Sequence, residues 1–417
     1  MEISQMLKPS LFSVLFFISV FLKAQVPSQG DSSSKKNESF SSNPAAQVDM
    51  IDIARNLFKK GTPRREDTII DKKGKVHFGA FPAAGYTLET GFAGVISANA
   101  AFFTNIHNHE QENISSILTS LAYTSHNQII FPIQSNIWIK SNKYNLLTDW
   151  RYLKYPSETY GLGGHTKLDS GYSLTYSYLK LHQTFLFRIG KELYTGLGID
   201  LDHFWNIQEI DPTTSQTDYR RYGFHTEETA SGISLNLLFD SRRNPINPQK
   251  GLFANIIFKP KFIFLGSTSN WQSLLVEVRS YHKIARGSGN ILALWSYNWF
   301  TVGGTPPYLL LPSTGWDEFS NTGRGYIQGR FRGRNMLDQE AEYRFVITPN
   351  GLIGGVVFVD AQSFTDMGSN RFEVVSPGAG IGIRIKLNKF SRTNVALDYA
   401  WGSKGSQGFF VNLGEVF

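Results

Sequence analysis

Residues 192–205, ELYTGLGIDLDHFW, decide the fold, because apolar and polar side chains alternate along them. Leu197 and Ile199 fall on one side of an extended chain, and Asp200 and Asp202 fall on the other. This two-residue period predicts a β-strand with one apolar face and one polar face. In segments about ten residues long, such alternation is typical of membrane barrels, whose strands meet lipid outside and a polar lumen inside.

The same period begins near residue 76 and continues to the end of the chain. A soluble β-sandwich would alternate too. The uniformity of the pattern, a candidate secretion signal and aromatic side chains near strand ends favour the membrane barrel. We therefore predict an all-β fold, a transmembrane antiparallel β-barrel over 76–417, integral to the bacterial outer membrane. The about sixteen expected strands, an even number as in single-chain bacterial barrels, are 76–84, 90–104, 113–124, 128–141, 144–160, 172–189, 192–206, 228–240, 251–265, 271–284, 290–302, 336–348, 352–362, 373–387, 392–402 and 407–417.

Residues 1–24 read as a signal peptide. Lys8 precedes the apolar stretch 11–22, and Ala24 offers a cleavage site. The stretch is shorter than the ~20 apolar residues that a membrane-spanning helix needs. An N-terminal anchor helix remains the alternative interpretation.

Residues 25–75 form the predicted N-terminal periplasmic segment. Its first half is rich in Ser, Gln, Asn and Lys, which predicts a disordered linker. A short helical pattern follows over 49–60, opened by Asp49 and stopped by Gly61 and Pro63. We expect this helix to dock on the barrel or plug it, with binding of a partner as the alternative.

Composition and motifs argue against enzymes and nucleic-acid binding. The chain has no Cys, which excludes a disulfide scaffold, a cysteine nucleophile and a cysteine zinc site. Its net charge is +7, but the basic residues do not form a platform interleaved with aromatic side chains, so no nucleic-acid partner is expected. No G-x-S-x-G or H-E-x-x-H motif occurs. An outer-membrane hydrolase whose site is assembled from several strands stays open as an alternative.

Two further patterns suggest ligand chemistry at first sight. His107, His109 and Glu110 include metal-ligand residue types, but they lie in an Asn-rich predicted turn without a second ligand pair at suitable spacing. The glycine clusters 161–164 and 378–382 lie outside any strand-loop-helix unit, so we expect them to serve close packing and bending. We predict no metal, no cofactor and no catalytic residue.

The loop 303–335 carries four arginines, and the strands after it carry carboxylates on their lumenal side. Parity places Glu342 and Asp360 inside the barrel. Because a guanidinium can bridge carboxylates with two hydrogen bonds, our hypothesis is that Arg324 packs inside the barrel against Asp360, Glu342 or both. An external loop with solvated arginines is the alternative.

These segments resemble the outer-membrane protein 85 superfamily, the BamA/TamA-like bacterial surface antigens. The resemblance covers 76–417 and rests on an ordered set of segments, none of which is specific alone. They are Gly85 to Gly91, the turn 240–251, Arg324-Gly325-Tyr326, Glu342-Tyr343-Arg344-Phe345 and Phe358-Val359-Asp360.

The resemblance implies a sixteen-stranded barrel whose sixth external loop folds into the lumen. It places the family's loop arginine at Arg324, followed by Gly325 and Tyr326, and the family's lumenal partner motif at Phe358 and Asp360. With Glu342, these residues form a predicted lock between loop and barrel. The family usually has glycine two residues after that aspartate, where this chain has Gln362.

The closing strand resembles the signal by which assembly machinery recognises barrel clients. Phe409, Val411, Leu413 and Phe417 are expected on one side of it, and Glu415 interrupts that stripe. The barrel-assembly machinery is therefore an expected partner, together with outer-membrane lipid.

The resemblance implies a role in outer-membrane protein assembly or in polypeptide or lipid translocation. Family insertases carry periplasmic POTRA domains, and we expect the residues before 76 to be too few for them. A periplasmic partner or a client polypeptide would then be recruited by 49–60, and a weak seam between the first and last strands would open towards the client. A passive or ligand-specific channel is the alternative, with the Arg324 loop as its constriction.

Overall fold

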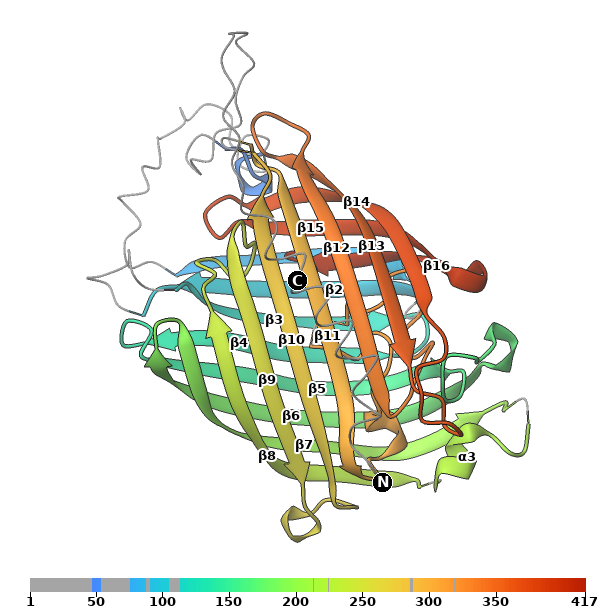
Figure 1. The fold of residues 1–417 in the computed structure, drawn as a ribbon. Coiled ribbons are helices and arrows are strands. Elements are labelled where there is room, and N and C mark those ends of the chain that lie inside the picture. Colours follow the sequence, from blue (N-terminus) through green and yellow to red (C-terminus); the bar gives the residue numbers. More distant parts are fainter. Residues whose placement is uncertain are drawn as a thin grey trace. The chain divides into compact units, whose positions relative to one another are not determined.

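Sixteen antiparallel strands form one sheet in which each strand pairs with the next along the chain (Figure 1). The computed structural model describes residues 47–53, 76–87, 91–104, 113–212, 214–223, 225–285, 288–318 and 320–417. The strands are β1 His77–Thr87, β2 Gly91–Phe102, β3 Ser115–Thr124, β4 Ile129–Ile139, β5 Tyr144–Thr159, β6 Tyr172–Gly190, β7 Leu193–Ile210, β8 Glu227–Asp240, β9 Gly251–Lys261, β10 Trp271–Lys283, β11 Ile291–Gly304, β12 Asn335–Val346, β13 Ile353–Phe364, β14 Ser376–Asn388, β15 Thr393–Gly402 and β16 Gln407–Leu413.

The all-β barrel class and the number of strands predicted from the sequence are confirmed. Alternation works as expected in β7, where Ile199 is 71% exposed on the outer face and Asp200 is 1% exposed on the inner face. The same division holds along β13 and β14, where Val359 and Ile381 are exposed. The outer face is therefore apolar and faces lipid, and the inner face holds the polar and charged side chains.

Connections at one end of the barrel are mostly short, and several at the other end are long. We number the connections at the second end L1 to L8 and assign that end to the cell exterior, as in known outer-membrane barrels. L3 (160–171), L4 (211–226), L6 (305–334) and L7 (365–375) are the longest of them. L4 contains the short α-helix α3 (Asp218–Gly223).

Residues 47–53 dock on two turns at the short-connection end. The Asp49 carboxylate accepts a hydrogen bond from the backbone N–H of Asp52 (2.8 Å), which caps a helical turn at 50–53. The same carboxylate accepts a hydrogen bond from the backbone N–H of Lys389, at 2.9 Å, and the Lys389 ammonium pairs with Asp52 at 2.8 Å. Docking on the barrel is thus seen for these residues, while 54–60 lie outside the described part of the chain.

Several sequence predictions fall on residues that the structure does not describe. The signal peptide 1–24, the linker 25–46 and the cluster His107, His109 and Glu110 are among them. Within the described residues, no helix is long and apolar enough to cross a membrane.

Candidate functional site: a loop locked inside the barrel

L6 folds back into the lumen as a closed hairpin. Its two arms meet at an isolated antiparallel bridge between Ser313 and Arg332. At its tip, one carboxylate oxygen of Asp317 accepts hydrogen bonds from the backbone N–H groups of Asn321 (2.8 Å) and Thr322 (2.7 Å). These bonds satisfy the polar backbone of a tight turn, so L6 keeps a defined conformation where water is scarce.

Arg324 is fully buried and reaches three carboxylates. Its Nη1 donates to Asp398 Oδ2 on β15 at 2.6 Å, and its Nη2 donates to Glu340 and Glu342 on β12. The face of the guanidinium lies on the ring of Phe358, with 3.5 Å between the guanidinium carbon and the ring centroid. Ion pairs and a cation–π contact therefore hold the loop from several directions.

Two further arginines extend this contact into a network. Arg344 on β12 donates to Glu342 at 2.6 Å. Arg384 on β14 donates to Asp398 Oδ1 and to Glu415 Oε2, the latter at 2.8 Å. We call these residues the lumenal charge network: Arg324, Arg344, Arg384, Glu340, Glu342, Asp398 and Glu415. Its three cations and four carboxylates connect L6 to strands β12, β14 and β15 and to the end of the chain.

The structure brings Arg324, Glu342 and Phe358 together, but Asp360 makes no ion pair with Arg324. Among the described residues, neither carboxylate oxygen of Asp360 has a hydrogen-bond partner. Asp398 takes the role expected of Asp360, although the sequence analysis does not single it out. Asp360 lies on β13, whereas Asp398 reaches the Arg324 guanidinium from β15. Gln362, at the family's glycine position, accepts a hydrogen bond from the Thr314 hydroxyl of L6 at 2.7 Å.

The glycines of β14 make room for these side chains. A Cβ at Gly380 would lie 2.2 Å from the Phe358 ring, and one at Gly382 would lie 1.8 Å from Asp398 Oδ1. Both glycines face the lumen, and Ile381 between them faces lipid. The cluster 378–382 therefore allows close packing, as expected. β14 has no side chains on its lumenal face at Gly380 and Gly382, and Phe358 and Asp398 occupy the space.

Gly325 and Tyr326 fasten L6 to the outer end of β15. Gly325 has φ +104°, and a Cβ there would lie 2.8 Å from the Trp401 backbone. The Tyr326 hydroxyl donates to the Pro377 carbonyl at 2.6 Å and accepts a hydrogen bond from the Ser403 backbone N–H at 2.8 Å. Left-handed backbone conformation and close approach both require glycine at 325.

The end of the chain corrects the expectation for Phe417. Phe409 and Val411 are exposed on the outer face, but β16 ends at Leu413 and Gly414, with φ +105°, turns the chain into the lumen. Phe417 is buried there and stacks on Trp295 at 5.1 Å between ring centroids. It therefore does not share a face with Phe409, Val411 and Leu413.

The inward tail is part of the same arrangement as L6. Arg344 donates to a main-chain oxygen of Phe417 at 2.9 Å, and the Asn321 side chain of L6 donates to the Val416 carbonyl at 2.7 Å. Glu415, which read as an interruption of an apolar stripe, belongs to the lumenal charge network through Arg384. Two lone charges among apolar residues are the sequence signals for this network: Asp398 within β15 and Glu415 just after β16.

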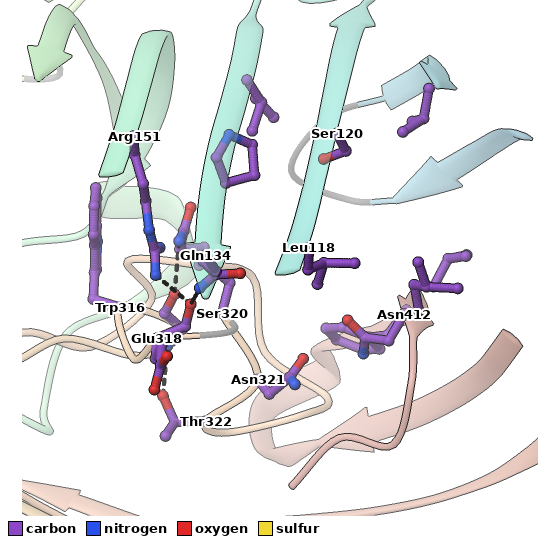
Figure 2. A pocket seen from close by; sticks show the side chains of 18 of the residues that line it. Leu118, Ser120, Gln134, Arg151, Trp316, Glu318, Ser320, Asn321, Thr322 and Asn412 are labelled. Carbon is purple, nitrogen blue, oxygen red and sulfur yellow. Dashed lines mark hydrogen bonds between the residues drawn. The ribbon is translucent and has the colours of Figure 1, made fainter. Parts of the chain in front are cut away.

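A lumenal cavity of about 390 Å³ adjoins L6 and β16 (Figure 2). Gln134 and Arg151 extend from β4 and β5 towards L6, where both donate to the Glu318 carbonyl, the former at 2.8 Å. Asn412 of β16 and Asn321 of L6 line the cavity on the other side. The cavity thus has a largely apolar lining into which the barrel, the loop and the last strand each place polar groups.

The two end strands of the sheet adjoin one another without a ladder. β16 pairs with β15 from Val395↔Leu413 to Trp401↔Gln407, and β1 pairs with β2 along its length. In the described part of the chain, no paired register joins β1 to β16. A hydrogen bond between the side chains of Asn99 on β2 and Thr393 on β15 (3.3 Å) spans this seam from the inside.

Comparison with known proteins identifies similar molecules. The Omp85 superfamily domain matches residues 121–417. The structure of BamA from Haemophilus ducreyi lacking POTRA domains 1-3 is similar with a TM-score of 0.53 at 14% identity, over 82% of this chain and 70% of that one. CdiB from Escherichia coli has a TM-score of 0.52 at 9% identity, over 81% of this chain and 62% of that one. At these identities the structural likeness establishes the fold alone, and no curated protein sequence matches the chain.

Proposed function

Because the chain belongs to the Omp85 superfamily, and is an integral barrel of the bacterial outer membrane, we propose that it acts in outer-membrane protein assembly or in the translocation of polypeptide or lipid. The observation that carries this proposal is the seam, where β1 and β16 adjoin without a hydrogen-bonded ladder among the described residues. Unpaired strand edges are templates for another strand. A client strand would add to them by backbone hydrogen bonds, with little demand on its sequence.

The short final strand supports this mechanism. β16 has seven residues, whereas β1 has eleven, so β16 is too short to cover the whole edge of β1. The lumenal cavity borders β16 and offers polar groups to a backbone that has left water. A client segment would therefore find hydrogen-bond partners both at the edge and inside.

L6 and the tail would control the seam. The tail 414–417 is held by Asn321 of L6 and by Arg344 and Arg384 of the lumenal charge network. As long as these bonds exist, the end of β16 is anchored inside the lumen, on L6 and on strands β12 and β14. We infer that L6 acts as a lock: its contacts fix the last strand, and their loss frees the edge.

The barrel fold and the docked N-terminal segment indicate which partners the proposal includes. Outer-membrane lipid surrounds the apolar face, and the barrel-assembly machinery would take this chain as its own client. A periplasmic partner or client polypeptide would meet residues 49–60. The described residues 47–53 dock beside the turns at 350 and 389. The proposal includes no nucleic acid.

Deletion of the gene followed by quantitative proteomics of the outer membrane tests the proposal. We expect the loss of several unrelated barrels or surface polypeptides, restored by the wild-type chain. Loss of the uptake of a single nutrient, with an unchanged outer-membrane proteome, would contradict it.

The channel alternative rests on the charged lumen around Asp149, Arg151, Lys180 and Lys261. L6 lies inside the lumen in this structure, where it would form the constriction. Removal of 315–335 should raise single-channel conductance sharply if the loop is a constriction. Unchanged conductance in planar bilayers would count against the channel.

A further inference from the structure

Three metal-ligating side chains meet on the external face, away from the lumenal charge network. His165 belongs to L3, and Asp366 and Glu373 belong to the two arms of L7. One ligand atom of each lies within 4.8 Å of the other two. Residues about two hundred positions apart in the sequence thus converge on one point between two loops.

The distances fit a shared cation better than a direct ion pair. His165 Nε2 is 3.4 Å from Glu373 Oε2 and 3.7 Å from Asp366 Oδ2. Charge-assisted hydrogen bonds between nitrogen and carboxylate are shorter, about 2.7–2.9 Å. Two ligands on one tetrahedral Zn²⁺ ion, each bound at ~2.0–2.2 Å, stand about 3.3–3.6 Å apart.

One oxygen of the Asp366 carboxylate is hydrogen bonded to the backbone, and the other lies near His165. Its Oδ1 accepts a hydrogen bond from the Gly164 backbone N–H at 3.1 Å. Its Oδ2 is inaccessible to solvent and accepts no hydrogen bond from the described residues. A buried carboxylate oxygen without a donor is costly, and a cation held with His165 and Glu373 would satisfy it.

The backbones of L3 and L7 lie close to the Asp366 carboxylate. Gly163 has φ +94°, and a Cβ there would lie 1.8 Å from Asp366 Oδ1. L7 is itself closed by a bridge between Thr365 and Phe372, which sets Asp366 and Glu373 side by side. The ligands therefore stand on two loops whose contact is fixed by backbone geometry.

His165 and Glu373 are exposed, so an ion from the medium has access.

We propose that His165, Asp366 and Glu373 bind one divalent transition-metal ion of the Zn²⁺ class, which clamps L3 to L7. One imidazole nitrogen and two carboxylate oxygens suit Zn²⁺, and a water molecule would complete the tetrahedron. The clamp also bears on L6, because Gly163 N–H donates to the Arg332 carbonyl at 2.7 Å. It would stabilise the outer end of the barrel whatever the barrel acts on.

Titration of the full chain in detergent micelles with ZnCl₂, followed by calorimetry after removal of metal by chelator, tests the site. We expect saturable binding of one Zn²⁺ per chain. His165→Ala and Asp366→Asn should each weaken it by at least about tenfold, since even the loss of an outer-sphere partner costs that much. His225→Ala is the matched control, an exposed histidine on L4 outside the cluster, and should bind as the wild type does.

Band shifts on heating in detergent gels show whether each variant is folded, and Glu373→Gln provides a third ligand substitution of almost unchanged shape. Absence of saturable binding by the wild type would overturn the site. Unchanged Zn²⁺ affinity in folded His165→Ala would also overturn it. Ca²⁺ binding that is as tight as Zn²⁺ binding and independent of His165 would overturn it too, because the loops would then form only an acidic surface.

Discussion

Replacement of Arg324 by alanine is the most informative perturbation of the lock. Arg324 shares Glu342 with Arg344, and it shares Asp398 with Arg384. Those two carboxylates therefore keep a cation in the variant. Glu340 keeps none, because its Oε1 pairs with Arg324 and its Oε2 has no hydrogen-bond partner among the described residues.

The magnitude follows from this asymmetry. Removal of one partner from a buried ion pair costs about 3–5 kcal/mol, mostly because a buried charge is left alone. We expect Arg324→Ala to lower the free energy of unfolding by about that amount. Glu340→Gln in the same chain should restore about 1–3 kcal/mol, since it removes the stranded charge. Glu342→Gln should not, because Glu340 would stay without a cation and Arg344 would lose the carboxylate that it contacts at 2.6 Å.

Guanidinium unfolding of the folded barrel in detergent, followed by tryptophan fluorescence, measures these differences. Arg334→Ala is the control, since this arginine of the same loop makes a solvent-exposed bond to the Gly304 carbonyl; its effect should stay within about 0.5 kcal/mol. A loss below about 1 kcal/mol for Arg324→Ala, or a further loss on adding Glu340→Gln, would refute the reasoning, because the contacts would then not be coupled.

Three further perturbations probe the tail, β14 and the docked segment. Phe417→Ala should destabilise the barrel by about 3 kcal/mol in the same unfolding assay, since a buried ring is lost; a change within error would show that the tail is not anchored. Gly380→Val should block folding or displace L6, because its side chain meets the Phe358 ring, while Ala379→Val on the outer face should fold normally; equal yields of heat-modifiable barrel would count against the packing account. Asp49→Ala removes a helix cap worth about 1 kcal/mol and should speed proteolysis near residue 50; an unchanged cleavage rate would mean that docking does not depend on the cap.

The barrel could be predicted from the sequence because the pattern that determines each strand lies within that strand. The two-residue period of β7 places Ile199 outside and Asp200 inside without knowledge of any distant residue. The position of β16 was predicted equally well up to Leu413. The turn at Gly414 was not, because alternation across Val411 and Leu413 gives no sign that the strand stops.

The site depends on contacts that local patterns do not contain. Parity placed Glu342 inside and the loop motif pointed to Arg324, yet parity alone could not choose between Asp360 and Asp398 as the partner. That choice depends on how deep L6 enters and on the room left by glycines of β14. Likewise, the convergence of His165 with Asp366 depends on the packing of two external loops, each of which reads as an ordinary connection.

A locked seam tests the central claim most directly. The chain has no cysteine, so cysteine pairs with one member in 78–82 of β1 and the other in 408–412 of β16 can be joined without competing thiols. Ala396→Cys with Asn412→Cys, which are partners within the β15–β16 ladder, is the matched control. In a deletion strain, the oxidised seam pairs should fail to restore the outer-membrane proteome and should recover on reduction, while the control pair restores it in both states. Full restoration by an oxidised, cross-linked seam would contradict the claim that the barrel works by opening between its first and last strands.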